Sequence, residues 1–189
     1  MSSILQGTFV NLRPLVSADA RVTLQWRQHD RARLLNAGSE TIEQQTRWIE
    51  SRPATEQNFI IELKDHTPIG MLSLVDINPQ LKRAEPARFL IGEEKAASRV
   101  PAAVEAMKLL YELAFDELKL MRVYGTIAEE NHRMIKWQKY LGMKEEGRLR
   151  RHYFINGRFQ DAVCLGLLEE EYRSVTLPRI RALLAATSL

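Results

Sequence analysis

This chain of 189 residues has little cysteine, no clustered histidines and no long apolar run, and each of these absences argues against a class of protein. The single cysteine, Cys164, allows no internal disulfide, and its place in the apolar run AVCLGLL is typical of a small buried residue. The four histidines are scattered and lack neighbouring cysteines, so no metal site is predicted. No apolar run approaches the length of a membrane helix, and no basic start precedes an apolar core. We therefore expect a cytoplasmic protein without a membrane partner.

Segments that would divide the chain are also missing. The sequence contains no repeats, no low-complexity tract and no linker rich in Gly, Ser or Pro. We therefore expect a single domain over 1–189, with a short helical tail at about 168–189. The 27 basic and 24 acidic residues are interleaved, without a basic tail or an aromatic–basic repeat. This pattern disfavours nucleic acid as a partner, and the net charge of +3 suits anionic small molecules.

What the chain does contain is an ordered alternation of strand-like and helix-like segments. The longest helical pattern, from Val100 to Leu118, repeats its apolar residues every three or four positions. Gly142 is typical of a helix end, Ser17 of a helix start, and Asn156-Gly157 of a type I′ hairpin turn. The expected strands cover 8–15, 58–63, 69–77, 87–92, 121–127, 147–155 and 158–168, and the expected helices cover 17–28, a stretch after 39, 100–118 and 130–141. This order predicts a mixed sheet covered by helices on its faces.

Two spacings in the second half of the chain point to a family. Glu105-Ala106 opens a helix that ends in AFDELKLMRV, and Asn131 stands eleven residues before Gly142 in YLGMKEEGRLR. In this order they resemble the GCN5-related N-acetyltransferase (GNAT) superfamily, in particular its branch of ribosomal-protein N-terminal acetyltransferases. The first half, through WRQHDRARLLN, RWIESR and NFIIEL, more loosely resembles the amino-sugar-nucleotide acetyltransferases of the same superfamily.

The resemblance implies a fold, an acyl donor and an assembly. The expected fold is α/β (α+β): a central mixed, mostly antiparallel, twisted sheet of about seven strands with helices on both faces. Acetyl-CoA is the expected co-substrate, without a metal, and a small-molecule amine is the expected acceptor. A homodimer through the C-terminal strands or the tail is an expectation at the level of the family.

The cofactor loop is the place where this chain departs most from the family pattern. In the family, the strand that carries the acetyl group leads into a glycine-containing diphosphate loop and then a helix, whose N–H groups and dipole face the phosphates. Here Pro101 and Ala103 stand in place of the glycines, or Ala102 and Val104 if the register slides by one residue. Proline is tolerated in a first helical turn, and alanine is tolerated where φ is negative. The alternative is a helix start that binds nothing. The residues expected to bind the cofactor are Phe89, Leu90, Ile91, Ser98, Arg99, Val100, Ala102, Ala103, Asn131 and Lys136.

Two of these cofactor residues have ordinary structural alternatives. Asn131 matches the asparagine that bonds pantetheine in the family, but asparagine is also a good helix N-cap. Lys136 would reach the nucleotide end of the cofactor, yet a lysine on an exposed helical face is usually only solvated.

The catalytic candidates come partly from the residues and partly from the resemblance. The family places its acid, a tyrosine or a serine, where this chain has Gln138 and Met134, which cannot donate a proton in that role. Tyr140 is the nearby alternative acid, although it lies about 200° round the helix from Gln138; its structural alternative is a partly buried aromatic residue. Glu85 is the expected base, because a desolvated carboxylate there could take a proton from the amine. The alternative bases are Glu93, Glu94 and His152.

The acceptor candidates are aromatic and basic. Trp26, Arg27 and Arg31 lie in the region that usually flanks the acceptor in this superfamily, and Arg151 lies on the last hairpin. Guanidinium groups bind phosphate through two hydrogen bonds, and Trp26 could stack on a base or a sugar. Together they favour an amino-sugar nucleotide over a polyamine. A ribosomal-type protein N-terminal acetyltransferase and a non-catalytic acyl-CoA-binding or interaction module are the alternative functions.

Overall fold

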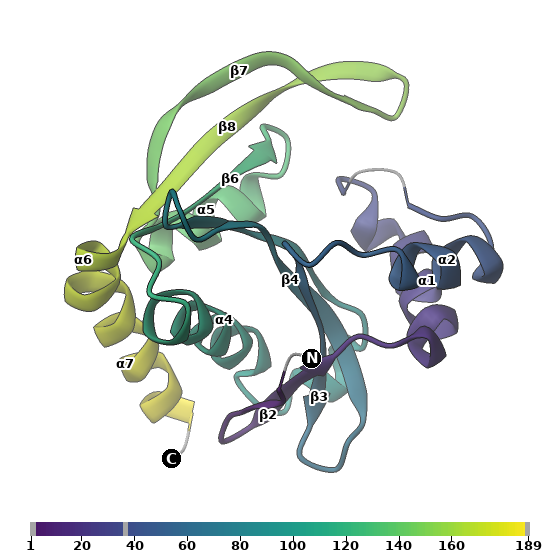
Figure 1. The fold of residues 1–189 in the computed structure, drawn as a ribbon, viewed down its shortest axis with the longest axis horizontal. Coiled ribbons are helices and arrows are strands. Elements are labelled where there is room, and N and C mark those ends of the chain that lie inside the picture. Colours follow the sequence, from purple (N-terminus) through teal and green to yellow (C-terminus); the bar gives the residue numbers. More distant parts are fainter. Residues whose placement is uncertain (1–2, 36–37, 188–189) are drawn as a thin grey trace.

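The protein folds around one mixed sheet. The computed structural model describes residues 3–35 and 38–187, and in this part of the chain the strands form an eight-stranded sheet in the order β1-β2-β3-β4-β5-β6-β8-β7 (Figure 1). Every neighbouring pair is antiparallel except β5 and β6. The strands are β1 (Leu5–Gln6), β2 (Val10–Pro14), β3 (Gln57–Leu63), β4 (Pro68–Asn78), β5 (Arg83–Ile91), β6 (Arg122–Ala128), β7 (Lys144–Ile155) and β8 (Arg158–Leu168).

The expected fold class is confirmed, with one strand more than the sequence predicts. The additional strand, β1, has two residues and pairs with β2. Two residues are too few to show an alternating pattern, so sequence periodicity could not reveal this strand.

Helices cover both faces of the sheet. The helix pair α1 (Ala20–Gln28) and α2 (Ile42–Glu50) lies on one face, while α4 (Ala102–Glu112) and α7 (Leu177–Thr187) lie on the other (Figure 1). Successive side chains of a strand point to opposite faces, and the core divides accordingly. Phe59 and Ile61 join the large cluster under α4, whereas Ile60 joins a smaller cluster with Trp26 of α1. The remaining helices are α3 (Glu94–Ala97), α5 (His132–Leu141) and α6 (Glu169–Glu171).

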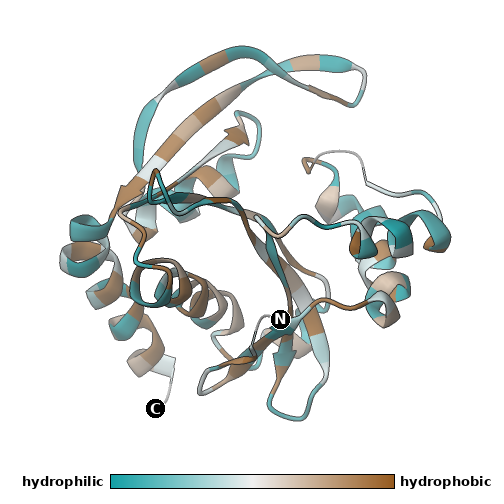
Figure 2. Ribbon diagram, in the orientation of Figure 1, coloured by the Kyte–Doolittle hydropathy of each residue, from teal (hydrophilic) through white to brown (hydrophobic). Residues whose placement is uncertain are grey.

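Helix α4 is the most deeply buried helix, and Figure 2 shows its predominantly hydrophobic colouring. A π-helical turn at Leu113–Glu117 continues it, which accounts for the longer pattern seen in the sequence. Glu105 is buried in α4, and its carboxylate accepts hydrogen bonds from the backbone N–H groups of Thr8, Phe9 and Val10 at 2.7, 2.6 and 2.7 Å. This carboxylate therefore ties the start of α4 to the turn between β1 and β2.

The C-terminal hairpin has the predicted turn. Asn156 and Gly157 both have positive φ, 52° and 76°, as a type I′ turn requires. β8 is largely buried, whereas β7 is the exposed edge of the sheet, and Figure 2 shows the contrast between the more hydrophobic β8 and the more hydrophilic β7. The predicted tail is helical through Thr187, and Ile180 of α7 is buried in the core. Among the described helices, none has the length and apolar character to span a bilayer.

One predicted helix start is wrong. Ser17 does not cap the first helix, because its hydroxyl donates to Glu50 at 2.9 Å. The carboxylate of Asp19 instead accepts from the Val16 N–H at 3.0 Å, and α1 follows this short 3-10 turn.

Candidate active site

The sheet opens where β5 and β6 separate. These parallel neighbours pair only at Arg83–Arg122 and Ala84–Val123, although both strands continue beyond. A cavity of about 700 Å³ begins just past this fork. These two strands contribute Glu85, Pro86, Ala87, Arg88 and Phe89 of β5 and Thr126, Ile127 and Ala128 of β6 to its lining.

A bulge shapes the β5 side of the cavity. Met71 pairs with Leu90 and Ser73 pairs with Ala87, so Arg88 and Phe89 together lie opposite one residue of β4. Arg88 has a φ of 55°, which is uncommon for a non-glycine residue. A bulge bends its strand and interrupts the regular ladder of hydrogen bonds, which re-aims the neighbouring side chains. The predicted strand at 87–92 is thus present, but it begins earlier and is bent at the cavity.

Glu85 is the carboxyl group among the described residues that line this cavity. Glu85 lies inside β5, one residue beyond the part of β5 that pairs with β6. The sequence had placed it before the strand. Burial raises the pKa of the half-buried Glu85 above the ordinary glutamate value, and the charge of Asp76 raises it further. A hydrogen bond from the backbone N–H of Thr126 and the charge of Arg88 oppose this rise in pKa. A carboxyl group in this environment can exchange a proton with a ligand amine.

Tyr153 is a cavity residue that the sequence did not single out. Its hydroxyl lies 2.6 Å from Thr126 Oγ1 and donates to the Thr126 carbonyl oxygen at 3.0 Å. Burial is the main cause of its raised pKa, so the phenol stays protonated. Tyr153 belongs to β7, where the register shifts between Leu149 and Tyr153 and Arg151 has a φ of 50°. A sequence pattern does not predict such a shift, and this is why Tyr153 was missed.

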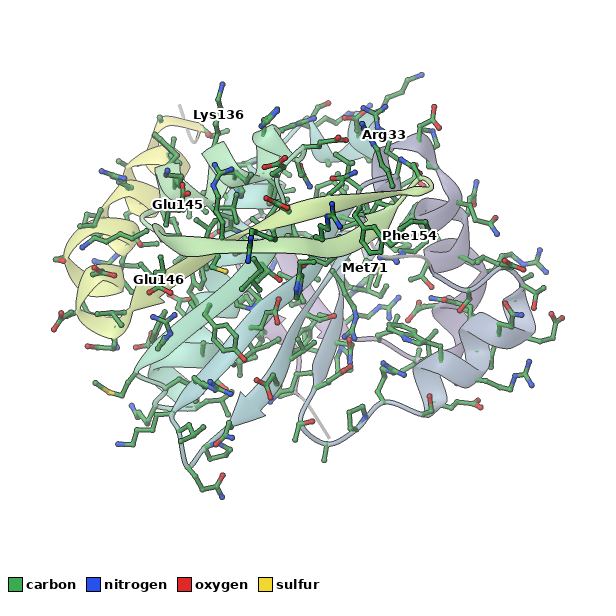
Figure 3. All side chains as sticks on the ribbon, turned by 90° about the horizontal axis from the view of Figure 1, so that it is seen from above. Arg33, Met71, Lys136, Glu145, Glu146 and Phe154 are labelled. Carbon is green, nitrogen blue, oxygen red and sulfur yellow. The ribbon has the colours of Figure 1, made fainter. Side chains whose placement is uncertain are left out.

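Helix α5 forms a neutral wall of the cavity. Asn131 caps this helix by accepting from the Met134 N–H at 3.2 Å, and it also lines the cavity, so both expected roles are geometrically compatible. Gln138 accepts from the buried Tyr111 hydroxyl at 3.1 Å, and its amide faces the Met134 sulfur. Lys136 is exposed and projects away from the sheet, outside the cavity (Figure 3).

Arginines and an indole form the wall on the side of α1 and α2. Arg27 and Trp48 line the cavity opposite α5, together with Gln44 and Gln45. Arg88 reaches the same wall from β5 and holds Glu56 with two contacts of 2.9 and 3.2 Å. Burial is the first cause of the lowered pKa of Arg27, and the charge of Arg88 is the second. Two cations therefore face one part of the cavity.

Trp26 does not reach the cavity. Its side chain is only 3% exposed and packs with Ile60, Met71 and Leu90 in the smaller core cluster. Its indole N–H donates to Glu93 at 2.9 Å, so Glu93 is also engaged here. The predicted stacking of Trp26 on an acceptor is corrected to a core role, because the fold places α1 against the sheet.

The other predicted acceptor residues fall elsewhere. Arg31 lies in the short 3-10 turn Asp30–Ala32, and its side chain is outside the described residues. Arg151 is exposed on β7 beside a shallow hollow of the hairpin, and its backbone N–H donates to Asp161 at 2.8 Å. Of the four acceptor candidates, only Arg27 lines the main cavity within the described part of the chain.

Tyr140 lies outside the cavity. Its side chain is 50% exposed, and the Arg179 guanidinium lies 5.9 Å from its ring centroid. Two residues of helix separate it from Gln138, a rotation of about 200° that carries it to the opposite side of α5. The proposal of Tyr140 as the acid is corrected on this ground.

The backbone of the expected diphosphate loop, residues 93–104, adopts no conformation that requires glycine. α4 begins at Ala102 after Pro101, whose φ is −75°, and none of the residues 93–104 has a positive φ. Ser98 does not cap α4, because its hydroxyl donates to the Lys95 carbonyl at 3.0 Å. The loop follows directly from β5, and the N–H groups of Ala103 and Val104 lie in a first helical turn, where α-helices leave donors without intrahelical partners.

The remaining loop and strand candidates differ in exposure. Arg99 is exposed, while Val100 packs against the main core and Ala102 is buried. In β5, Leu90 joins the core around Trp26, Ile91 packs on the main core, and Phe89 lines the cavity. Phe89 is therefore the member of this triplet that lines the cavity, and it also packs against the main core.

Comparison with known proteins decides the family. The sequence model of the acetyltransferase (GNAT) domain matches residues 10–144, which is most of the chain. The chain belongs to this family. A crystal structure of a GCN5-related N-acetyltransferase from Brucella melitensis has the same fold, with a TM-score of 0.80, 23% identity, and coverage of 95% of this chain and 84% of that one.

Two curated relatives share part of the sequence. The spermidine N(1)-acetyltransferase of Escherichia coli (strain K12) is 30% identical over 118 residues, which are 62% of this chain and 61% of that protein. The enzyme of the same name from Vibrio cholerae is 29% identical over 117 residues, which are 62% of this chain and 66% of that protein. The chain thus spans less than two thirds of the length of either relative.

Proposed function

We propose that this GNAT protein is an N-acetyltransferase that uses acetyl-CoA as co-substrate and acetylates the primary amine of a small molecule. The observation that carries the proposal is the half-buried Glu85 at the fork of β5 and β6, inside a cavity large enough for a ligand. Membership of the GNAT family supports acetyl-CoA as the acyl donor.

The chain's own residues supply the proton chemistry. A primary amine is mostly protonated near neutral pH and must lose a proton before it can attack an acyl carbon. Glu85 accepts that proton, directly or through a water molecule, because its raised pKa brings it closer to the pH at which proton exchange is efficient. Acetyl-CoA supplies the activated thioester. Gln138 and Met134 carry no acidic proton, and a thiolate is a good leaving group that solvent can protonate.

Other residues of the cavity hold the co-substrate in this proposal. The bend of β5 at Arg88 and Phe89 presents backbone groups to the acyl end. The amide of Asn131 bonds the neutral pantetheine chain, and the first N–H groups of α4 face the diphosphate. Pro101 removes one donor from this helix start, so we expect diphosphate binding through fewer N–H groups than a glycine loop provides.

Several acceptors fit the general reaction. An amino-sugar nucleotide follows from the sequence resemblance of the first half of the chain. Spermidine follows from the names of the curated relatives. A protein N-terminus, as in the ribosomal-type enzymes, would need an open groove rather than a cavity. A homodimer through β7 and β8 belongs to the same family-level proposal, and size-exclusion chromatography with light scattering tests it.

The first experiment is isothermal titration of the protein with acetyl-CoA and with CoA. We expect both to bind, and we expect Asn131→Ala to weaken the binding by about three- to tenfold, the value of one or two hydrogen bonds. Asn131→Ser is the matched control, because serine retains the helix cap and removes only the amide. If Asn131→Ser restores full affinity, Asn131 acts only as a cap.

The titration also separates the alternatives. If the wild-type protein shows no detectable binding of acetyl-CoA, the proposed function is contradicted. If Pro101→Gly then binds acetyl-CoA, the chain has the remains of a cofactor site that the proline disables. Binding of acetyl-CoA without CoA release across a broad panel of amines favours the non-catalytic acyl-CoA-binding module.

A further inference from the structure

Thr126 of β6 holds two side chains of the cavity, and these come from two other strands. Its backbone N–H donates to the carboxylate of Glu85 in β5. Its carbonyl oxygen accepts from the hydroxyl of Tyr153 in β7 at 3.0 Å. The single phenolic proton is used in that bond, so the Thr126 hydroxyl is the donor in the second contact, in which Thr126 Oγ1 lies 2.6 Å from Tyr153 Oη. Thr126 therefore links the carboxyl group at the fork to a phenol.

These two side chains stand where a neighbouring strand would otherwise bond. β5 and β6 pair only as far as Ala84 and Val123, so within the described part of the chain β5 offers Thr126 no ladder partner. The N–H and C=O groups of one strand residue point to the same edge of the sheet. Glu85 takes the N–H and Tyr153 takes the C=O. Both backbone groups of Thr126 are thus satisfied by side chains, as groups away from water require.

The C-terminal hairpin sets the direction of Tyr153. Figure 1 shows β7 and β8 curving past the end of β6. The register shifts between Leu149 and Tyr153, so that residues 150–152 of β7 lie opposite Asp161 alone. Asp161 closes this bulge by accepting from the Arg151 N–H at 2.8 Å. A bulge bends its strand and re-aims the neighbouring side chains, which is the local reason why Tyr153 reaches Thr126.

The side chain of Glu85 lies against the main chain of β6. A Cβ atom at Gly125 would lie 3.3 Å from Glu85 Oε1 and 3.5 Å from its Cγ. Gly125 directly precedes Thr126, so the carboxylate rests beside the N–H that it binds. A shift of this piece of main chain would therefore change the hydrogen bond to Glu85.

Other ionisable groups act on Glu85 from three strands. The charge of Asp76 on β4 raises the pKa of Glu85, and the charge of Arg88 on β5 lowers it. The hydroxyl of Tyr124 on β6 donates to Asp76; burial is the first cause of the raised pKa of Tyr124, and the charge of Glu85 is a lesser one. Among the causes that lower the pKa of Glu85, the hydrogen bond from the Thr126 N–H is larger than the charge of Arg88. This bond is the contact that Tyr153 can control.

We infer that Tyr153 is a positioning residue for Glu85, because it fixes the main chain of Thr126 and keeps the Thr126 N–H directed at the carboxylate. The inference rests on the proposed function, in which Glu85 accepts the proton of the amine. It adds a contribution from the C-terminal hairpin to a site otherwise built from β5 and β6.

The first test follows the ionisation of Glu85 directly. Carbon-13 NMR records the side-chain carboxyl resonance of Glu85, assigned by its loss in Glu85→Gln, over a series of pH values. We expect a higher pKa of Glu85 in Tyr153→Phe than in the wild-type protein, because a less firmly held Thr126 N–H stabilises the carboxylate less. Tyr140→Phe is the matched control, since it removes an exposed hydroxyl outside the cavity and should leave this titration unchanged.

Variants of Thr126 locate the link. Thr126→Val removes the hydroxyl that bonds Tyr153 but keeps the branched shape and the carbonyl, so we expect a shift in the same direction as in Tyr153→Phe and smaller. Thr126→Ser retains the hydroxyl and should shift the titration less than Thr126→Val. Thermal unfolding shows whether each variant is folded.

Activity measures the consequence for catalysis. Tyr153→Phe should move the acidic limb of kcat/KM to higher pH and lower kcat a few-fold, with unchanged affinity for acetyl-CoA by calorimetry. In a Glu85→Gln background the same substitution should have little further effect on kcat, because Tyr153 acts through Glu85.

Two results would overturn the inference. One is a Glu85 titration that is the same in Tyr153→Phe and in the wild-type protein. The other is a loss of kcat from Tyr153→Phe that is equally large in the Glu85→Gln background. Failure of the proposed function looks different: acetyl-CoA would not bind, or no amine would release CoA, while Tyr153→Phe would still shift the NMR titration of Glu85.

Discussion

Two glutamates in two regions of this molecule have the same chemical group in opposite environments. Glu105, at the turn between β1 and β2, is 2% exposed, and three backbone N–H groups donate to its oxygens. Glu85, at the fork of β5 and β6, is half-buried and receives a hydrogen bond from the Thr126 backbone. The comparison teaches that burial alone does not mark a reactive group. A carboxylate surrounded by donors holds the fold together, whereas one beside a cavity is accessible to a ligand.

The largest effect is expected at the first of these sites. Glu105→Ala leaves three backbone N–H groups without their acceptor, and we expect a loss of about 3–5 kcal/mol of unfolding free energy. Urea denaturation measures it. Glu105→Gln keeps one acceptor oxygen and should lose less. A loss below about 1 kcal/mol for Glu105→Ala would mean that water replaces the carboxylate without penalty.

The next effect concerns activity. Glu85→Gln removes the proposed base but keeps its shape, and we expect kcat to fall by about 10²- to 10³-fold, the usual range for a general base. Calorimetry should show unchanged affinity for acetyl-CoA, and urea denaturation should show nearly unchanged stability. Activity that survives Glu85→Gln would place the base elsewhere, with Glu94 and His152 as the next candidates.

The raised pKa of Glu85 also predicts a pH dependence. The carboxylate form accepts the proton, so kcat/KM of the wild-type protein should rise as pH increases through the pKa of Glu85, which lies above the ordinary glutamate value. The contribution of Glu85 to the unfolding free energy changes with pH in the opposite direction. A carboxyl group whose pKa is higher in the folded state binds its proton more tightly there, so its contribution is complete below the unfolded pKa and is lost as pH rises through the folded pKa. Glu85→Gln should abolish both trends, and activity and urea denaturation at a series of pH values measure them.

The smallest effect is expected at Tyr153. Tyr153→Phe removes the hydroxyl that bonds Thr126, next to the backbone N–H that binds Glu85, and we expect a loss of about 1 kcal/mol of stability and a few-fold loss of kcat. Tyr140→Phe is the matched control, because Tyr140 is exposed outside the cavity. A larger loss of kcat for Tyr140→Phe than for Tyr153→Phe would contradict this placement of the site.

Local patterns predicted most of the framework. The spacing of apolar residues located α4, and the Asn156-Gly157 pair located the hairpin, because both signals depend on neighbours in the chain. Asn131 was placed correctly at the start of α5 for the same reason. The helix start after Pro101 also follows from local chemistry, since every residue of that loop has the ordinary negative φ that alanine and proline accept.

The composition of the cavity depended on contacts between distant segments. Trp26 and Trp48 both belong to the first half of the chain and are similar in sequence, yet the fold buries Trp26 between α1 and the sheet and leaves Trp48 on the cavity wall. Arg88 reaches that wall through a bulge, and Tyr153 reaches the fork through a register shift in β7. Neither irregularity has a sequence signature in this chain.

By itself, the sequence determined the order of the elements, the mixed sheet and the family, because periodicity, turn residues and motif spacing act over short stretches of chain. Only the tertiary structure decided which glutamate is enclosed by donors and which faces a cavity, and which arginines line the same cavity. The physical reason is that solvation, hydrogen-bond partners and the proximity of charges depend on segments brought together across the sheet, such as Glu105 with residues 8–10 and Arg27 with Arg88.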